Sequence, residues 1–305
     1  MYYPKSMVIM NDITETLQKK ILSRALPDGG FPSKPGGKYR PDATAWAVLA
    51  FSAAGVQEDL ANRARAKLAA GQMDDGRLSL SRDYPNAFWP TALAILAWQN
   101  APQHLESQMR GVDFLLAAAG KTVEKIDDST VADDTALRGW PWIEETYSWV
   151  EPTSLALLAL EATGKGNHER AHEARRMLLD RQMESGGWNY GNTKVFGQQL
   201  WPMPESTGLA LNALAGRTEQ KNVKASILYL KQEMGRLRTP LSFAWGYLGL
   251  SAWGERPLLN RGLLQKNLSL QERYGEHETE HLALLLICLH APQGFLSVFD
   301  RDADK

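Results

Sequence analysis

The sequence lacks several features that mark specialised classes of protein. Its 305 residues contain one cysteine and carry a formal net charge of −1. A single cysteine excludes a disulfide framework, and Cys288 lies in the apolar stretch 284–289, where we expect a buried, inert thiol. The balanced charge and the absence of a long basic stretch argue against nucleic acid as a partner.

Long apolar runs and targeting signals are also missing. The longest apolar runs reach about ten residues, half the length that a membrane-spanning helix needs. Residues 1–5 lack the charged and then apolar pattern of a secretion signal. We therefore expect a cytoplasmic protein without a transmembrane segment, and peripheral contact with a membrane stays open. What the sequence does have is 44% hydrophobic residues, enough for a large core, and ten tryptophans.

A short pattern built around a threonine occurs four times in the chain. In three copies an acidic residue stands two positions before the threonine, and in the fourth a tryptophan replaces it; the copies span residues 42–50, 89–97, 151–159 and 205–213. Apolar residues cover nearly every side of each predicted helix, which is typical of buried helices. Two further segments, 243–249 and 280–286, fit the pattern more loosely. The sequence thus predicts six buried helices.

Amphipathic, charge-rich segments alternate with these buried helices. They span residues 13–26, 58–72, 104–119, 168–183, 219–234 and 258–271. Because such a helix pair cannot bury its apolar face alone, the economical arrangement is a double ring with the apolar helices inside. We predict an all-α fold, an (α/α)6 toroid of six inner and six outer helices, in one domain over residues 1–305. Residues 121–138 are predicted to form a surface insertion before the Gly139-Trp140 loop.

The loops before the inner helices repeat as well. An apolar residue stands thirteen positions before the threonine in three copies and nineteen before it in the fourth; these residues are Phe31, Leu78, Trp140 and Trp188. Glycine or arginine precedes each of them, and a turn is expected there. The longer fourth interval predicts a longer loop before residue 207.

The motif at the end of one outer helix resembles a known repeat. Gln182-x3-Gly186-x-Trp188, with a related pattern that begins at Gln72, resembles the Gln-Trp repeat of squalene and oxidosqualene cyclases. The inner helices are similar to the barrel helices of these terpene cyclases, whose toroid is shared by protein prenyltransferase β subunits. The resemblance covers roughly residues 13–291 and implies a single-barrel, terpene-cyclase-like protein. Squalene-type cyclases resemble two joined toroids, so a homodimer or a partner protein could be needed to close the cavity.

The resemblance also includes an acidic motif, but its spacing in this chain does not place that motif at the start of an inner helix. Class II terpene cyclases protonate an alkene with the central Asp of Asp-x-Asp-Asp-Thr-Ala, and Asp133-Asp134-Thr135-Ala136 resembles part of that motif. The family motif opens an inner helix, whereas Asp134 lies six residues before Trp140, inside the insertion. We therefore expect a solvated acidic loop at this position.

No metal and no cofactor are predicted. Prenyltransferase β subunits hold zinc with an Asp, a Cys and a His. Cys288 and His290 are two residues apart on one predicted helix, so their side chains point about 200° apart. His277 and His281 are four residues apart, which is a weak metal signal by itself. The chain has no Asp-Asp-x-x-Asp diphosphate motif, so Mg²⁺ is not implied.

Carboxylates are predicted to meet at one mouth of the barrel. Parallel inner helices bring six N-termini together, and the residues two positions before the threonine slot are Asp42, Trp89, Glu151, Glu205, Leu241 and Glu278. Such acids can simply cap helices, because a helix N-terminus has unpaired N–H groups and partial positive charge. In an apolar cavity they can also raise one another's pKa, so that one acts as a general acid or base. Glu151 is the first catalytic candidate, followed by Asp42 and Glu205.

Aromatic residues of the mouth loops are the candidate substrate contacts. They are Trp89, Trp140, Trp142, Tyr147, Trp149, Trp188, Tyr190 and Trp201. Glu278 and His281, which begin the last inner helix, join them as candidates. Indole and phenol faces stabilise a carbocation, and they also suit sugar rings.

Three functions fit this sequence. The leading hypothesis is a terpene-cyclase-like isomerase or lyase that binds an apolar isoprenoid in the barrel and uses a mouth carboxylate as acid or base. The alternatives are a non-catalytic toroid that binds a lipid or a protein, and a carbohydrate-active toroid of the lyase type. The cavity discriminates among them, because an enclosed apolar cavity favours an isoprenoid and a polar, open cavity favours a glycan.

Overall fold

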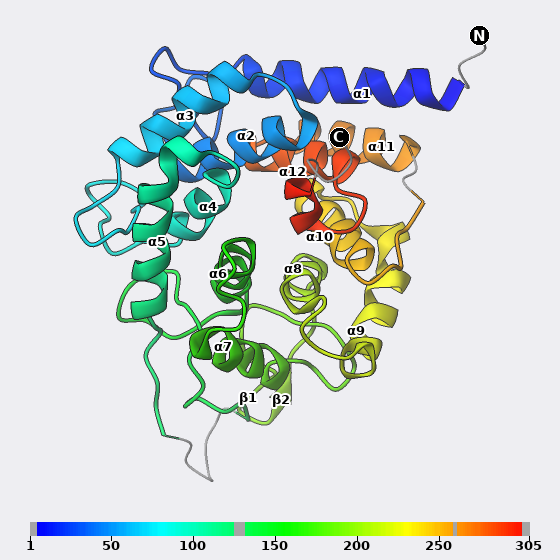
Figure 1. Ribbon diagram of the computed structural model, residues 1–305. Helices are drawn as coiled ribbons and strands as arrows, with labels where there is room; N and C mark the ends of the chain where they lie inside the picture. The colour runs from blue at the N-terminus through cyan, green and yellow to red at the C-terminus, as the bar shows by residue number, and fades with distance from the viewer. Residues whose placement is uncertain (1–4, 125–131, 259–260, 301–305) are drawn as a thin grey trace.

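A computed structural model describes residues 5–124, 132–258 and 261–300, without the side chains of 5–11, 261 and 271. The chain forms a double ring of helices, which confirms the predicted all-α (α/α)6 toroid (Figure 1). The inner helices are α2 (Pro41–Ala54), α4 (Pro90–Ala97), α6 (Val150–Ala162), α8 (Pro204–Leu214), α10 (Pro240–Ser251) and α12 (Thr279–His290). The outer helices are α1 (Lys5–Leu22), α3 (Glu58–Ala70), α5 (Leu105–Ala117), α7 (Glu169–Asp180), α9 (Gln220–Glu233) and α11 (Arg261–Tyr274).

The inner ring is closed by contacts between its first and last helices. Each inner helix contacts the next one along the chain, and α12 packs against both α10 and α2. Figure 1 looks along the axis of this ring, with the outer helices around it. All residues of α4 and nearly all of α2 are buried, as expected for helices that are apolar on every side.

The outer helices follow the predicted segments, with one clear shift at the N-terminus. The segment predicted over residues 13–26 is a longer and earlier helix, α1, that ends at Leu22. Residues 24–30 turn instead, since the Leu26 N–H donates to the Gly30 carbonyl and the Gly29 N–H to the Leu26 carbonyl. Gly29 has φ +85°, a left-handed conformation that favours glycine and that this turn requires.

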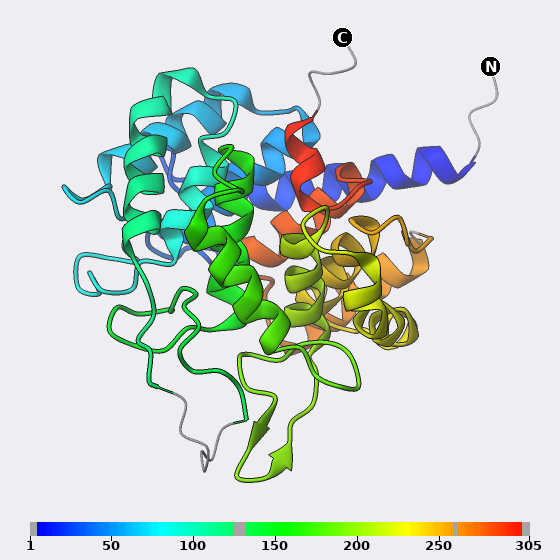
Figure 2. The same cartoon turned by 60° about the horizontal axis from the view of Figure 1, so that its bottom comes forward.

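The buried threonines attach each of four inner helices to the loop before it. The hydroxyl of Thr44, Thr91, Thr153 and Thr207 accepts a hydrogen bond from a backbone N–H at 2.9–3.0 Å; the donors are Phe31, Leu78, Trp140 and Trp188. All four threonines are completely buried. The repeated interval of thirteen residues is therefore the length of chain between a threonine and its partner. In the fourth copy the extra residues form the hairpin of β1 (Lys194–Val195) and β2 (Gln198–Gln199), which projects from the molecule in Figure 2.

A short 3-10 helix closes one end of the barrel. This helix, η3 (Phe295–Phe299), follows α12 and contacts α2, α6 and α12. The Phe295 ring lies between the indoles of Trp46 and Trp245, with centroids 6.0 and 5.6 Å away, and it is fully buried. The open end of the barrel is the opposite one, where the inner helices begin. Two more 3-10 turns, η1 (Pro102–His104) and η2 (Met234–Arg236), extend the loops next to α5 and α9.

Other predictions about the chain have separate outcomes. Within the described residues, no helix is both long and apolar enough to cross a membrane. Part of the predicted surface insertion, residues 125–131, lies outside the described residues. The extent of that insertion and the assignment of residues 1–305 to a single domain stay predictions.

Candidate functional site: a cavity at the mouth of the barrel

A cavity of about 290 Å³ lies inside the ring at the end where the inner helices begin. Its polar wall consists of Ser33, Arg40, Asp42, Glu151, Glu278 and Glu280. Its apolar wall consists of Ala43, Trp46, Trp89, Trp142, Leu155 and Trp245. The cavity thus combines four carboxyl groups with four indoles, and Phe295 seals the barrel below Trp46 and Trp245.

Asp42 is held in this cavity by an arginine that precedes it by two residues. The Arg40 Nε and Nη2 atoms donate to the two carboxylate oxygens of Asp42 at 2.8 and 2.6 Å. A two-pronged bond of this kind fixes the orientation of both groups. Asp42 is the second residue of α2, and its side chain is 9% exposed. Asp42 is therefore a fixed, ion-paired carboxylate.

Two other carboxyl groups in the cavity hold their protons more tightly than usual. Burial and the nearby Glu205 raise the pKa of Glu151 to about 7. Burial, followed by the charges of Glu151, Asp42 and Glu278, raises the pKa of Glu280 to about 8. The positive charge of Arg40 opposes the rise at Glu280 only in part. Both groups therefore favour the protonated form more strongly than an exposed carboxyl group does, and they lie in the same cavity as the ion-paired Asp42.

The position of Glu280 corrects the predicted alignment of the acids. Alignment by the threonine placed Glu278 in the slot, but α12 begins at Thr279, so Glu280 is its second residue, as Asp42 and Glu151 are in α2 and α6. Glu278 instead precedes the helix as its cap: its side chain accepts from the backbone of His281, while the His281 Nδ1 accepts from the Glu278 N–H at 3.4 Å. Thr279 does not make the bond that the other threonines make. Its hydroxyl donates to the Pro32 carbonyl.

Glu205 and His281 lie near the cavity but outside its lining. The Ser242 hydroxyl donates to Glu205 Oε2 at 2.7 Å, and Glu205 acts on the cavity through its charge on Glu151. Burial lowers the pKa of the His281 imidazole, which serves as half of the cap of α12.

Of the predicted aromatic contacts, the structure brings Trp89 and Trp142 into the cavity. Their rings meet edge to face with centroids 5.4 Å apart, and they come from the loops before α4 and α6. Trp46 and Trp245, which are both 2% exposed, also line the cavity and form an edge contact at 5.9 Å. The sequence contained a signal for them, because Trp46 follows Asp42 by four positions and so shares a helix face with it.

The other predicted aromatic residues are placed elsewhere. Trp140 and Trp188 are fully buried, and their indole N–H groups donate to the carbonyls of Leu115 and Leu178. They close loops against outer helices and do not line the cavity. Tyr147, Tyr190 and Trp201 are 55%, 51% and 84% exposed, and Trp149 lines a separate pocket with Tyr147.

The expectation of a solvated acidic loop is wrong for Asp133. This side chain is 3% exposed and pairs with Arg181 at 3.0 Å. It also accepts hydrogen bonds from the backbone N–H and hydroxyl of Thr193. The pair ties the 132–138 segment to the end of α7 and to the loop before β1. It is not among the residues that line the barrel cavity.

Arg40, Glu280 and Ser33 are site residues that the sequence did not identify as such. Arg40 adjoins Asp42 in sequence, but only the extended backbone before α2 turns its guanidinium toward that carboxylate. Among the described residues, no group of three or more His, Cys, Asp or Glu side chains is placed to hold a metal ion.

Comparison with known proteins supports the architecture. No protein-family model matches the sequence, and no curated protein does. Among solved structures, an inactive variant of the α-1,6-mannanase GH76A of Salegentibacter sp. HEL1_6, in complex with α-1,6-mannotriose, matches with TM-score 0.58 at 13% identity over 92% of this chain and 98% of the other. A variant of the type II terpene cyclase MstE from Scytonema, in complex with geranylgeranyl dihydroxybenzoate, matches with TM-score 0.60 at 13% identity over 98% and 99%. An α-amylase from Clostridium perfringens matches with TM-score 0.60 at 11% identity over 92% and 97%. At these identities the likeness is one of fold.

Proposed function

We propose that the barrel cavity is the active site of an acid–base enzyme that acts on a sugar-sized, hydroxylated substrate. One observation carries this proposal: carboxyl groups with raised pKa values share a small cavity with an ion-paired carboxylate and four indoles. When the environments of two carboxyl groups keep one protonated and the other ionised, the pair is suited to act as an acid and a base in one reaction.

The polarity of the cavity favours a sugar over a long isoprenoid. Its volume of about 290 Å³ is at the small end of ligand pockets, which are about 300–1,000 Å³. Half of the lining residues are polar, which suits hydroxyl groups and makes the transfer of an all-carbon chain less favourable. The indoles of Trp46 and Trp142 supply flat apolar surfaces for the faces of a ring.

The cavity residues suggest a hydrolytic step. Glu280, which retains its proton near neutral pH, donates that proton to the leaving oxygen as the bond from carbon to that oxygen breaks. The oxygen of a water molecule bonds to the carbon, and Asp42 accepts the proton that this water loses. Arg40 holds the Asp42 carboxylate in place for this role. Glu151 lies close enough to Glu280 to act on its pKa, so its own ionisation tunes the acid.

The comparisons lend support to the proposal without singling it out. A mannanase and an amylase share the ring over nearly the whole chain, and both names describe action on carbohydrates. These likenesses carry no residue of those enzymes over to this chain.

The proposal is tested with aryl glycosides and with short oligosaccharides that include α-1,6-mannotriose. Sugar release is followed by chromatography for the wild type, Glu280→Gln and Asp42→Asn. We expect each variant to lose about 10²-fold or more of the rate, since a positioned acid or base contributes about 10²–10⁴-fold. Glu184→Gln is the matched control, because Glu184 is exposed and is not among the residues that line the cavity. No release from any glycoside, or equal rates for Glu280→Gln and the wild type, would refute the proposal.

The second candidate is the terpene-cyclase-like activity that the sequence resemblance implies. It is favoured by a protonated carboxyl group beside four indoles, which could protonate an alkene and stabilise the resulting cation. Squalene, farnesyl diphosphate and geranylgeranyl diphosphate belong in the same assay for this reason. A cyclised product that depends on Glu280 would favour this candidate, while binding without turnover would favour a non-catalytic toroid.

A further inference from the structure

A second cavity, of about 550 Å³, lies against the outer side of the segment that carries Arg40 and Asp42. Three stretches of chain form its walls: residues 39–41 before α2, residues 67–73 at the end of α3, and the loop 78–85. Tyr39 and Pro41 line this outer cavity, whereas Arg40 and Asp42 line the barrel cavity. Arg40 has extended dihedral angles, φ −135° and ψ 124°, so successive side chains point to opposite sides. One extended segment therefore separates the two cavities.

Two buried polar atoms on the walls of the outer cavity lack partners. Within the described residues, neither the hydroxyl of Tyr39 nor the amide oxygen of Gln72 has a hydrogen-bond partner. Such groups are rare in folded proteins because leaving them unpaired is costly. The Gln72 amide nitrogen is engaged, since it donates to the carbonyls of Gly76 and Ser107 at 2.8 and 2.9 Å. Its oxygen is therefore held in place as an acceptor without a donor, and Tyr39 belongs to the same cavity lining.

The charged residues that line the outer cavity are both basic. Lys67 and Arg82 line it, and no Asp or Glu is among its lining residues. Lys67 pairs with Asp28 at 2.8 Å, and its ammonium lies 5.2 Å from the centre of the Tyr39 ring. Arg82 is exposed and makes no ion pair or hydrogen bond within the part of the chain that the structure describes. The remaining wall is apolar and includes Met73, Leu78 and Leu80.

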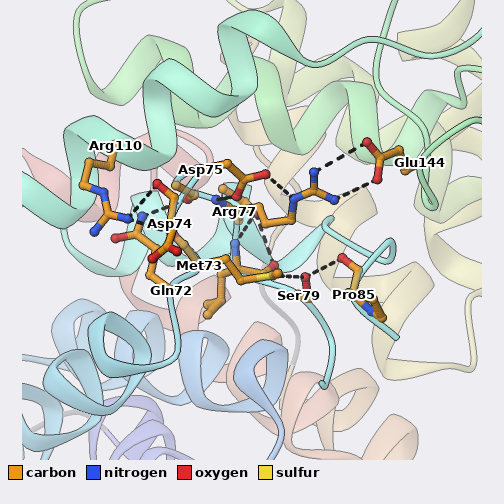
Figure 3. A network of polar contacts seen from close by, with 12 residues as sticks. Gln72, Met73, Asp74, Asp75, Arg77, Ser79, Pro85, Arg110 and Glu144 are labelled. Atoms are coloured by element: carbon orange, nitrogen blue, oxygen red, sulfur yellow. Dashed lines mark hydrogen bonds and ion pairs between the residues drawn. The ribbon is translucent and has the colours of Figure 1, made fainter. Parts of the chain in front are cut away.

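A polar network holds the wall of the outer cavity in one shape. Figure 3 shows this network around the loop that follows α3. Arg110 donates to the Met73 carbonyl at 2.6 Å, and the Ser79 hydroxyl donates to the Pro85 carbonyl at 2.5 Å. Arg77 bridges Asp75 at 2.6 Å and Glu144 at 2.8 Å. The cavity is thus formed in advance by bonded loops, which lowers the entropic cost of binding a ligand.

We propose that the outer cavity binds a small organic anion with an apolar body and an amide or hydroxyl donor, and that its occupancy is transmitted to Arg40 and Asp42. The anionic group of the ligand would face Arg82. Its donor would bond to the Gln72 amide oxygen, and an acceptor on the ligand would accept a hydrogen bond from the Tyr39 hydroxyl. The apolar body would lie on Met73 and Leu80. A ligand that draws in Tyr39 displaces the segment between the cavities, and this displacement moves the Arg40–Asp42 pair.

N-octanoylglycine is a suitable ligand for the test, because it combines a carboxylate, an amide and an alkyl tail. Binding is measured by calorimetry for this acid and for its neutral primary amide. We expect the acid to bind at submillimolar concentration, and the amide about tenfold more weakly because it lacks the charge. Arg82→Gln should weaken binding of the acid about tenfold, and Tyr39→Phe about threefold to tenfold. Arg176→Gln is the matched control, since Arg176 is an exposed arginine on α7.

The same experiment has outcomes that overturn the proposal. If the acid and its amide bind equally, or if Arg82→Gln matches Arg176→Gln, the site does not select an anion. Tyr39→Phe retains the ring and removes only a hydroxyl without a partner, so loss of binding in this variant is not expected to arise from misfolding. A melting temperature for each variant checks that point.

The coupling to the barrel cavity has a separate readout. The indole N–H signals of Trp89 and Trp142 are followed by NMR and assigned with Trp→Phe variants. Saturation with N-octanoylglycine should shift both signals and leave that of Trp253 unchanged, because the Trp253 indole is bonded to Leu211 and lines neither cavity. Binding without these shifts would overturn the coupling. Binding measured in Glu280→Gln is expected to match the wild type, so this inference and the proposed catalytic function can fail independently.

Discussion

The two ends of the barrel are closed in opposite ways. At one end Phe295 fills the space between Trp46 and Trp245 and is fully buried. At the other end the same ring of helices begins with Asp42, Glu151 and Glu280, whose carboxyl groups are brought together against their mutual repulsion. The first arrangement stabilises the fold, whereas the second costs stability and is the kind of exception found at functional sites. The contrast gives four predictions, which follow from the largest expected effect to the smallest.

Truncation of Phe295, which fills the closed end of the barrel, should have the largest effect on stability. Phe295→Ala leaves a cavity between Trp46 and Trp245, and we expect the free energy of unfolding to fall by about 3–5 kcal/mol. Urea denaturation followed by circular dichroism measures this change. Phe196→Ala is the control, since Phe196 is 79% exposed. A loss of less than about 1 kcal/mol, close to the level of an exposed site, would show that η3 does not seal the barrel.

Breaking one of the threonine attachments should have the next largest effect. Thr153→Val leaves the Trp140 N–H buried without an acceptor, and we expect a loss of about 1–3 kcal/mol. Thr16→Val is a matched change on the exposed face of α1. Chemical denaturation of both variants decides the point. Equal losses would mean that the attachment contributes nothing specific.

The free energy of unfolding should depend on pH through the carboxyl groups at the mouth, and not through Phe295 at the closed end. The pKa of Glu280 is about 8 in the folded protein, above its ordinary value of 4.5, so the folded state binds the extra proton. The corresponding stability is present below pH 4.5 and is lost as the pH rises through 8. Between pH 6.5 and 9 we expect the wild type to lose about 1–2 kcal/mol more than Glu280→Gln, which retains only the contribution of Glu151. Starting at pH 6.5 limits the opposite contribution of His277, whose pKa is lowered to about 4.

Urea midpoints at each pH measure this difference. Phe196→Ala should follow the wild-type pH dependence, because it leaves the mouth carboxyl groups intact. A Glu280→Gln variant with the wild-type slope would contradict the assignment of the proton to Glu280.

Substitution of an exposed mouth aromatic should have the smallest effect on stability. Trp201 is 84% exposed, and Trp201→Ala is expected to change the free energy of unfolding by less than about 0.5 kcal/mol. Differential scanning calorimetry of the variant measures this. A larger loss would place Trp201 among the packing residues of the loops, with Trp140 and Trp188.

The ring itself could be predicted from the sequence because its helices are internally redundant. Four of the six inner helices repeat a threonine, and all six have an apolar surface on nearly every side, so pattern alone locates them. The acid of α12 was missed because that helix has no threonine at the repeated position. The predicted alignment put Glu280 there, which moved the acid position two residues too early, to Glu278. The fate of Asp133 depended on Arg181 and Thr193, which are distant in sequence and leave no periodic signal. Similarly, Trp140 and Trp188 are buried with their indole N–H groups donating to the carbonyls of Leu115 and Leu178, whereas Trp89 lines the cavity. The sequence pattern does not separate these tryptophans.

The threonine attachments have a consequence for how such a barrel could diversify. Each hydroxyl fixes the start of an inner helix to a residue that precedes it by thirteen positions in three loops and by nineteen in the fourth. The fourth loop accommodates its added residues as the β1–β2 hairpin, while Thr207 makes the same bond as the others. The ring thus tolerates insertions between two anchored points, because a longer surface loop costs little further closure entropy. Changes of substrate preference can therefore accumulate in the mouth loops, and loop grafting between these anchor pairs offers a route to engineer new specificity on an unchanged frame.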